Sequence, residues 1–193
     1  MRKLIEITFM SIDGVIDAPD IVQEVQRYFL SNEEREVYQK EKLFAADALL
    51  LGRKTYEVFS KAYPSMAKSG KGAPTGFVDR MNSIPKYVAS TTLKDKEMLW
   101  NASVIRGDIA QEIQKLKELP GKDIVKYGTG ILDRVLFAQD LVDVLCIVLY
   151  PFVLGHGKRL FEGIDITKHM SLSDEKRLEN GTVILEYNPL KSF

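Results

Sequence analysis

The sequence predicts an α/β protein with a mostly parallel central sheet and an antiparallel edge formed by its C-terminal residues. Two observations predict this fold class. Short apolar stretches, typical of buried strands, alternate with helical patterns up to about residue 150. Beyond that point, 170–178 and 183–187 have the pattern of two strands on either side of Glu179-Asn180-Gly181-Thr182. An Asn-Gly turn between such stretches is typical of a β-hairpin.

Local signals place the remaining elements in order. Strands are expected over 3–10, 48–51, 85–90, 104–105, 123–127 and 142–150, and helices over 53–62, 77–83, 109–119 and 131–138. Gly, Pro and Ser are frequent in 64–76, which is therefore expected to be a long exposed loop. Since no repeat or low-complexity segment divides the chain, residues 1–193 are expected to form a single domain.

A further helix is predicted to begin at Ser31-Asn32-Glu33-Glu34, which has the pattern of a capping box. Its apolar side is expected to run through Val37, Tyr38 and Phe44. Glu34 falls on the same stripe, so its carboxylate is either the capping group or an acid that faces inward.

Composition excludes several classes of partner. Lys and Arg together number 27, as do Asp and Glu, so no net charge favours nucleic acid or an anionic membrane surface. No apolar segment reaches transmembrane length and the N-terminus lacks a signal-type stretch, so a cytoplasmic location is expected. The single cysteine, Cys146, lies in an apolar stretch, where a buried structural thiol is favoured over a nucleophile.

The most informative local pattern is Ala48-Leu49-Leu50-Leu51-Gly52-Arg53-Lys54-Thr55-Tyr56. A strand that turns into a helix through glycine presents backbone N–H groups at the positive end of the helix dipole, where an anion binds readily. Arg53 and Thr55 add a guanidinium and a hydroxyl in the first helical turn. Taken alone, the pattern is better explained as a helix cap.

Two further turns make an anion-binding site the better explanation of the Gly52 turn. Gly128-Thr129-Gly130 also lies between a predicted strand and a predicted helix, and Ser90-Thr91-Thr92 follows another strand. Open α/β sheets bind ligands in a crevice at the carboxyl ends of their strands. The three turns are therefore expected to converge, and the Gly52 turn becomes the expected site for the phosphates of a cofactor.

Other chemistries have little support. Gly128-Thr129-Gly130 lacks the third glycine of a dinucleotide fingerprint, since that position is Asp133, and Gly155-His156-Gly157-Lys158 lacks the Ser or Thr of a P-loop. Neither His156 nor His169 has a partner at metal-ligand spacing, so no metal site is expected. Because no nucleophile elbow occurs, the reactive group of an enzyme is expected to be a bound cofactor.

The candidates for a proton donor or orienting acid stay open at this point. Asp13 follows the first predicted strand and is equally well explained as the residue of an Asp-Gly turn. Tyr127 either presents its hydroxyl at the end of a strand or packs there, and Glu34 has the two roles given above.

The motifs occur in an order that resembles a known family. Ser11-x-Asp13-Gly14, the stretch from Leu51 to Glu57, Val88 to Thr92, Gly128 to Gly130, and Pro151 to Phe161 follow one another along nearly the whole chain. The pattern resembles the dihydrofolate reductase-like proteins of the riboflavin-reductase branch, which are similar to the C-terminal domain of the bifunctional deaminase-reductase. The resemblance implies a three-layer α/β/α fold.

By the same resemblance, the chain is expected to bind NADPH and to reduce a pterin-like or ribosylaminopyrimidine-like substrate. The turn of Gly52, Arg53, Lys54 and Thr55 is then the expected cofactor-phosphate site, Ser90 and Thr91 lie near the adenosine ribose and its 2′-phosphate, and Gly128, Thr129, Gly130, Ile131 and Leu132 cradle the pyrophosphate. Ser11, Asp13 and Gly14 border the nicotinamide side, and the substrate-binding acid falls near Glu34. Asp13 and Glu34 are thus the candidate catalytic residues.

Some alternatives remain. Lys54, Lys94 and Arg134 are candidates for the cation that would select NADPH over NADH. The alternative function is a non-catalytic NADP(H)- or nucleotide-binding module that retains the fold, and ATP binding is a weaker third option. A homodimer is expected from family analogy and from the long apolar strand at 142–150.

Overall fold

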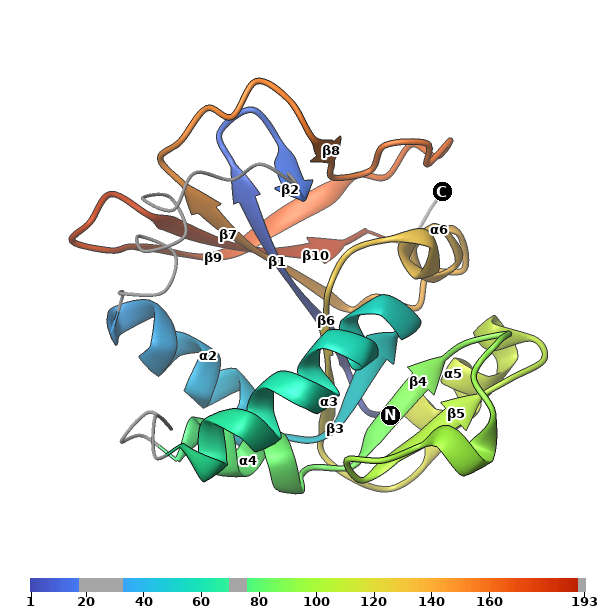
Figure 1. Cartoon of the computed structure of the whole chain (residues 1–193). Coiled ribbons are helices and arrows are strands. Elements are labelled where there is room, and N and C mark those ends of the chain that lie inside the picture. The colour runs from blue at the N-terminus through green and yellow to red at the C-terminus, as the bar shows by residue number, and fades with distance from the viewer. Residues whose placement is uncertain (18–32, 70–75, 191–193) are drawn as a thin grey trace.

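The computed structural model describes residues 1–17, 33–69 and 76–190. An eight-stranded sheet with the order β5-β4-β3-β6-β1-β7-β10-β9 forms its centre (Figure 1). The strands are β1 (Leu4–Ser11), β3 (Ala46–Gly52), β4 (Lys86–Ala89), β5 (Ala102–Ile105), β6 (Asp123–Tyr127), β7 (Val144–Tyr150), β9 (Met170–Arg177) and β10 (Val183–Pro189). Neighbours from β5 to β7 are parallel, whereas β10 runs antiparallel to β7 and β9. The predicted mostly parallel sheet with an antiparallel C-terminal hairpin is confirmed.

Helices cover both faces of this sheet (Figure 1). The helices are α2 (Glu33–Ala45), α3 (Arg53–Lys68), α4 (Phe77–Ser83), α5 (Ile109–Glu118) and α6 (Ile131–Ala138), with a short 3-10 turn at Asp95–Glu97. Helices α2, α3 and α4 contribute to one core cluster, and α5 and α6 to the other. Because successive residues of a strand point to opposite faces, Leu49 lies in the first cluster and Leu50 in the second. The three-layer α/β/α arrangement is therefore as expected.

Helix α3 is longer than the sequence predicts. The expected loop over 64–76 is wrong for 64–68, which are helical, while 70–75 lie outside the described residues. Pro64 removes one helical hydrogen bond, but the chain beyond it still closes a turn, because the Ser69 N–H donates to the Ser65 carbonyl at 3.0 Å. The Asn82 side chain of α4 also donates to the Tyr63 carbonyl at 3.2 Å, which supports α3 beside the proline.

The buried face of α2 also differs from the predicted stripe. Val37 and Phe44 are exposed, whereas Tyr38 and Leu43 are buried. Residues three and four positions apart share a helix face, and Arg35 lies three positions before the buried Tyr38 and four before the buried Gln39. Arg35 therefore falls on the buried side of α2, whereas Glu34 lies at the margin of that side. This rotation decides which side chain of α2 reaches the functional site. Ser31 and Asn32 of the expected capping box lie outside the described residues.

Strand β7 is an interior strand, paired with β1 on one side and β10 on the other. Its apolar surface is thus covered within the chain, so the length of this strand no longer argues for a dimer, and homodimerisation stays a prediction. Cys146 is fully buried in β7, and burial raises the pKa of its thiol to about 11. A structural role for this cysteine fits that environment.

A small two-stranded sheet and the edge strand β9 complete the architecture. The short strands β2 (Val15–Asp17) and β8 (Lys158–Arg159) pair beside the carboxyl edge of the central sheet. At the far side, β9 forms the edge of the sheet, and its residues after Met170 are exposed.

Within the described ranges, no helix is both long and apolar enough to cross a bilayer.

Truncation of Leu50, which is fully buried in β3, tests this core. Leu50→Ala is expected to lower the free energy of unfolding by about 2–5 kcal/mol, because it leaves a cavity between β3 and the α5–α6 layer. Leu119→Ala, at a half-exposed leucine after α5, is expected to change it by less than about 0.5 kcal/mol. Urea unfolding of both variants measures the difference, and equal effects would contradict the assigned core.

Candidate functional site

The predicted turns meet at the carboxyl edge of the sheet. Gly52 ends β3, Gly128 follows β6, and these two strands are parallel neighbours. Ser90 follows β4 on the other side of β3, and Ser11 ends β1 beside β6. Since parallel strands share the direction of their ends, the four turns lie along one edge.

Gly128 and Thr55 bring two of these turns into direct contact. Gly128 has φ +80°, a left-handed conformation that favours glycine, and a Cβ atom built on it would lie 2.1 Å from Thr55 Oγ1. No side chain fits between the backbone of the β6 turn and the first turn of α3. The expected convergence of the Gly52 and Gly128 turns is therefore present in the structure.

The cations of the Gly52 turn are exposed. Arg53 Nη1 donates to Glu57 Oε1 at 2.9 Å on the surface of α3, and Lys54 is exposed beside it. An exposed pair of this kind contributes little to stability, so Arg53 exchanges its partner at small cost. Gly52 caps α3 in an extended conformation, with no side-chain hydrogen bond to the helix.

Ser90 and Thr91 differ in their environments. Ser90 is buried, and its Oγ accepts hydrogen bonds from the N–H groups of Thr92 and Leu93 at 3.2 and 3.1 Å. Its hydroxyl therefore shapes the loop after β4. Thr91 is exposed at the tip of that loop.

The start of α6 forms the other half of the site. Thr129 Oγ1 lies 2.6 Å from Thr8 Oγ1 of β1, the Gly130 N–H donates to the Asp133 carboxylate, and Ile131 is exposed. The Asp133 N–H donates to the Gly130 carbonyl at 3.2 Å, so the oriented N–H groups that the first turn offers to an anion are those of Ile131 and Leu132. Thr129, Gly130 and Ile131 border a shallow hollow that is also lined by three cationic side chains, Arg134, Lys158 and Arg159, and by one carboxylate, Glu162.

A buried cluster of charged groups lies directly beneath the Gly128 turn. Lys126 Nζ donates to the Gly128 carbonyl at 2.7 Å, lies 3.5 Å from Glu6 Oε2, and pairs closely with the Asp133 carboxylate. All three charged side chains are essentially inaccessible to water. One cation thus faces two carboxyl groups, and burial raises the pKa of Glu6 because its charged form loses hydration. With Glu6 protonated, the positive charge of Lys126 is balanced by the negative charge of Asp133, and this ion pair fixes the Gly128 turn.

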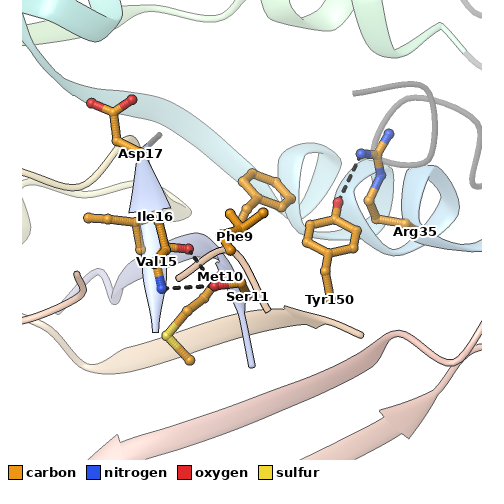
Figure 2. Close-up of a pocket in the computed structure, with 9 residues that line it drawn as sticks. Phe9, Met10, Ser11, Val15, Ile16, Asp17, Arg35 and Tyr150 are labelled. Atoms are coloured by element: carbon orange, nitrogen blue, oxygen red, sulfur yellow. Dashed lines mark hydrogen bonds between the residues drawn. The ribbon is translucent and has the colours of Figure 1, made fainter. Parts of the chain in front are cut away.

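A cavity of about 270 Å³ opens at the ends of β1 and β7 (Figure 2). It is lined by Phe9, Met10, Ser11, Val15, Ile16, Asp17, Arg35, Tyr150 and Leu154. The rings of Phe9 and Tyr150 stack with centroids 6.2 Å apart, and Arg35 Nη1 donates to the Tyr150 hydroxyl at 3.1 Å. Ile16 also lines the cationic hollow, so the cavity and the hollow are neighbours.

The two candidate catalytic acids do not line this cavity. The Asp13 carboxylate accepts hydrogen bonds from the Ser11 hydroxyl and from the N–H groups of Leu154 and Gly155, at 2.7, 3.1 and 2.8 Å. These bonds lower the pKa of Asp13 to about 2, so it is ionised at neutral pH and has no proton to donate. Its carboxylate ties the β1–β2 turn to the loop after β7.

Glu34 and Tyr127 are likewise absent from the described lining of the cavity. Glu34 Oε2 accepts from the Glu179 N–H at 2.9 Å and so contacts the C-terminal hairpin. The Tyr127 hydroxyl is buried on the α3 side of the sheet near Phe59, and burial raises its pKa. The geometry gives no contact that supports a catalytic role for Asp13 or Glu34, and the role remains a prediction.

Sequence reasoning missed most of the residues that line the site, among them the charged and aromatic ones. Arg35, Phe9 and Tyr150 line the cavity, and Lys158 and Arg159 line the hollow. No local signal singled out Arg35, because Arg35 and Glu34 lie three and four positions before Tyr38 and both spacings place a side chain on its face. The other residues are assembled by the pairing of β2 with β8 and of β1 with β7, which no local pattern in the sequence reveals.

The close packing of Gly128 against Thr55 predicts that only glycine is tolerated at position 128. Gly128→Ala is expected to destabilise the protein by more than Gly155→Ala, which has a similar φ of +75° but open space around the added methyl. Backbone strain of about 1–2 kcal/mol is common to both variants, and overpacking against Thr55 adds about 1–3 kcal/mol to the first. Urea unfolding compares them; Thr55→Ala in the Gly128→Ala background should restore part of the loss, and equal losses in the two single variants would refute the contact.

The buried cluster predicts a specific pH dependence. An unfolded glutamate loses its proton near pH 4.5, whereas folded Glu6 keeps it to higher pH. The contribution of Glu6 to stability is therefore full below about pH 4.5 and is lost as pH rises through its raised pKa. Glu6→Gln is expected to remove this slope, measured as the free energy of unfolding against pH. Glu118→Gln on the surface of α5 should leave it unchanged, and an unchanged slope in Glu6→Gln would contradict the assignment.

Comparison with known proteins extends these observations. A protein of Bacillus subtilis (strain 168), the uncharacterized protein YyaP, is 30% identical over 142 residues, which are 74% of this chain and 73% of that protein. The fold matches a diaminohydroxyphosphoribosylaminopyrimidine deaminase/5-amino-6-(5-phosphoribosylamino)uracil reductase of Thermotoga maritima (TM-score 0.62, 14% identity), with 98% of this chain covering 57% of that longer chain. It also matches dihydrofolate reductase of Enterococcus faecalis complexed with NADP(H) (TM-score 0.53, 17% identity, 98% and 97% of the two chains).

The family model of the RibD C-terminal domain matches residues 2–184, which is nearly the whole chain. The dihydrofolate reductase-like fold and this match agree with the resemblance that the sequence motifs indicated. The chain therefore belongs to the RibD C-terminal domain family.

Proposed function

We propose that this chain is an NADPH-dependent reductase of a small heterocyclic substrate of the pterin-like or ribosylaminopyrimidine-like class. The observation that carries the proposal is one continuous arrangement at the carboxyl edge of the sheet. The Gly52 and Gly128 turns touch through Thr55, and the cationic hollow beside them shares Ile16 with an apolar cavity. An elongated ligand with an anionic end and a ring end fits this order of environments.

The phosphate end of such a ligand suits the turns. Gly128 packs directly against Thr55 and so holds the two turns together, and the start of α6 adds oriented N–H groups. Lys158 and Arg159 supply positive charge from β8, and Arg53 supplies it from α3. These residues are the ones that would hold the cofactor phosphates.

The ring end suits the cavity. NADPH, when bound, supplies a hydride from its nicotinamide ring. The protein's contribution is to hold the two rings against one another and to keep water out, which Phe9, Ile16 and Tyr150 do as apolar walls. Ser11 lies at the bottom of this region, where its Oγ accepts from the Val15 N–H at 2.9 Å and so fixes the β1–β2 turn.

A second function is favoured by one observation. Among the cavity-lining residues that the structure describes, the one carboxylate is Asp17, which is exposed. A protein that binds NADP(H) without turnover would need no proton donor. The two functions are separated by whether bound NADPH is oxidised when pterins, pyrimidines or simple carbonyl compounds are added.

Isothermal titration calorimetry, which measures the affinity of the protein for NADPH, tests the proposal. Arg53→Met is expected to weaken NADPH binding about tenfold or more, because a hydrogen bond from a charged group contributes about 1.5–3 kcal/mol. Lys115→Met removes a cation from an exposed ion pair on α5 and should leave the affinity unchanged. Absence of binding at millimolar NADPH, or equal affinity in Arg53→Met and the wild type, would overturn the proposal.

A further inference from the structure

We infer that Glu6, buried beneath the Gly128 turn, takes up a proton when an anion binds at that turn, so that ionisation of Glu6 weakens the binding. Glu6 is fully buried and acts through Lys126 and Asp133, so it is a positioning residue and not a ligand-binding one. The inference rests on the proposed function in one respect, because it concerns the regulation of the site that would hold the cofactor phosphates.

The first step is the connection between the buried cluster and the turn. Lys126 Nζ donates to the Gly128 carbonyl at 2.7 Å, so this carbonyl faces the buried side of the turn. In a trans peptide the following N–H points the opposite way, so the Thr129 N–H points away from Lys126. Asp133 pairs with Lys126 and accepts from the Gly130 N–H. The cluster thus fixes the peptide groups that border the cationic hollow.

The second step is the charge of the cluster. One cation, Lys126, faces two carboxyl groups, and ionisation of both would leave an uncompensated negative charge away from water. Asp133 has Lys126 and the Gly130 N–H as close donors, whereas Glu6 Oε2 lies 3.5 Å from Lys126 Nζ. Glu6 therefore keeps its proton. The loss of hydration, together with the nearby charge of Asp133, holds the pKa of Glu6 well above its usual range.

The third step is the set of charges that face Glu6. The groups that act on it from β6 and α6 are the two partners just named. From β7, the residue in register with Glu6 is the apolar Leu145. From α5, the buried Lys117 pairs instead with Asp143, at 2.6 Å. Ionisation of Glu6 therefore changes the cluster from neutral to one net negative charge.

The fourth step links this charge to an anion in the hollow. Gly130 borders the hollow and its N–H is bonded to Asp133, so a bound anion lies against the cluster. Between buried groups a charge is screened less than at the surface, and an ionised Glu6 therefore repels the anion. An ionised Glu6 also competes with Asp133 and the Gly128 carbonyl for the Lys126 ammonium. By thermodynamic linkage the anion favours protonated Glu6 by the same factor, and the proton comes from solvent.

Calorimetric titration of the full chain with NADPH at several pH values tests the inference. The range runs from about pH 7.5 to about pH 9.5, where the charge of the ligand is constant because phosphate monoesters lose their second proton near about pH 6. Wild-type affinity is expected to fall at least about fivefold as pH rises through the raised pKa of Glu6. Glu6→Gln, which is neutral throughout, should bind with little change. Glu118→Gln makes the same substitution on the exposed surface of α5 and should keep the wild-type profile.

A second control and a second measurement separate Glu6 from other titrating groups. Lys86 also titrates in this range, because burial lowers its pKa to about 8, but it begins β4 at the opposite end of the sheet. Lys86→Arg, whose guanidinium does not titrate, should keep the wild-type profile. Binding enthalpies in Tris and in HEPES at about pH 8.5 count the protons taken up on binding. The wild type is expected to take up a fraction of one proton, and Glu6→Gln none.

Several results would overturn the inference: a flat wild-type profile, no proton uptake by the wild type, or a pH dependence that persists in Glu6→Gln. ADP is titrated in the same way, and binding of neither NADPH nor ADP would also overturn it. Thermal unfolding shows whether Glu6→Gln is folded, and the wild-type proton count stands without any variant. A pH-dependent affinity without NADPH oxidation by any tested substrate contradicts only the reductase, whereas oxidation with a flat profile contradicts only the role of Glu6.

Discussion

The contact between the Lys126 ammonium and the Gly128 carbonyl is the interaction on which the candidate site depends. A buried ammonium is stable only when it is paired and its hydrogen bonds are satisfied, and here Asp133 supplies the charge and Gly128 the acceptor. Asp133 also accepts from the Gly130 N–H, so the same carboxylate fixes the start of α6. One buried group thus joins a strand, a turn and a helix.

This arrangement divides the site into two parts with different physical character. The turns are defined by backbone geometry, by the tight approach of Gly128 to Thr55, and by the hydroxyl contact between Thr8 and Thr129. The cavity is defined by mostly apolar side chains from several elements. Asp13 is ionised and occupied by three hydrogen bonds. The chain is therefore better equipped to hold and orient ligands than to move protons by itself.

Much of the fold follows from local sequence, because apolar stretches bounded by glycine and an Asn-Gly hairpin are recognised without knowledge of distant contacts. The Gly52 and Gly128 turns were predictable for the same reason, and so was their shared edge. The inward face of α2 was not, since Val37 and Phe44 are as apolar as Leu43 and only packing against the sheet distinguishes them. The buried Lys126 and Glu6 also escaped notice, because a charged residue in a short strand is usually assigned to the surface. The pairing of β2 with β8 depends on partners more than 140 positions apart.

The edge formed by β9 has a consequence for how the sheet meets other copies of itself. A sheet edge offers unpaired backbone groups to any strand that approaches, and proteins protect such edges with charged side chains. Asp174, Glu175, Lys176 and Arg177 lie side by side along this strand, all of them exposed. A second chain that added a strand here would have to strip water from these charges and match their order of signs. The same four residues therefore limit aggregation, and they direct self-association, where it occurs, to surfaces other than the hairpin edge.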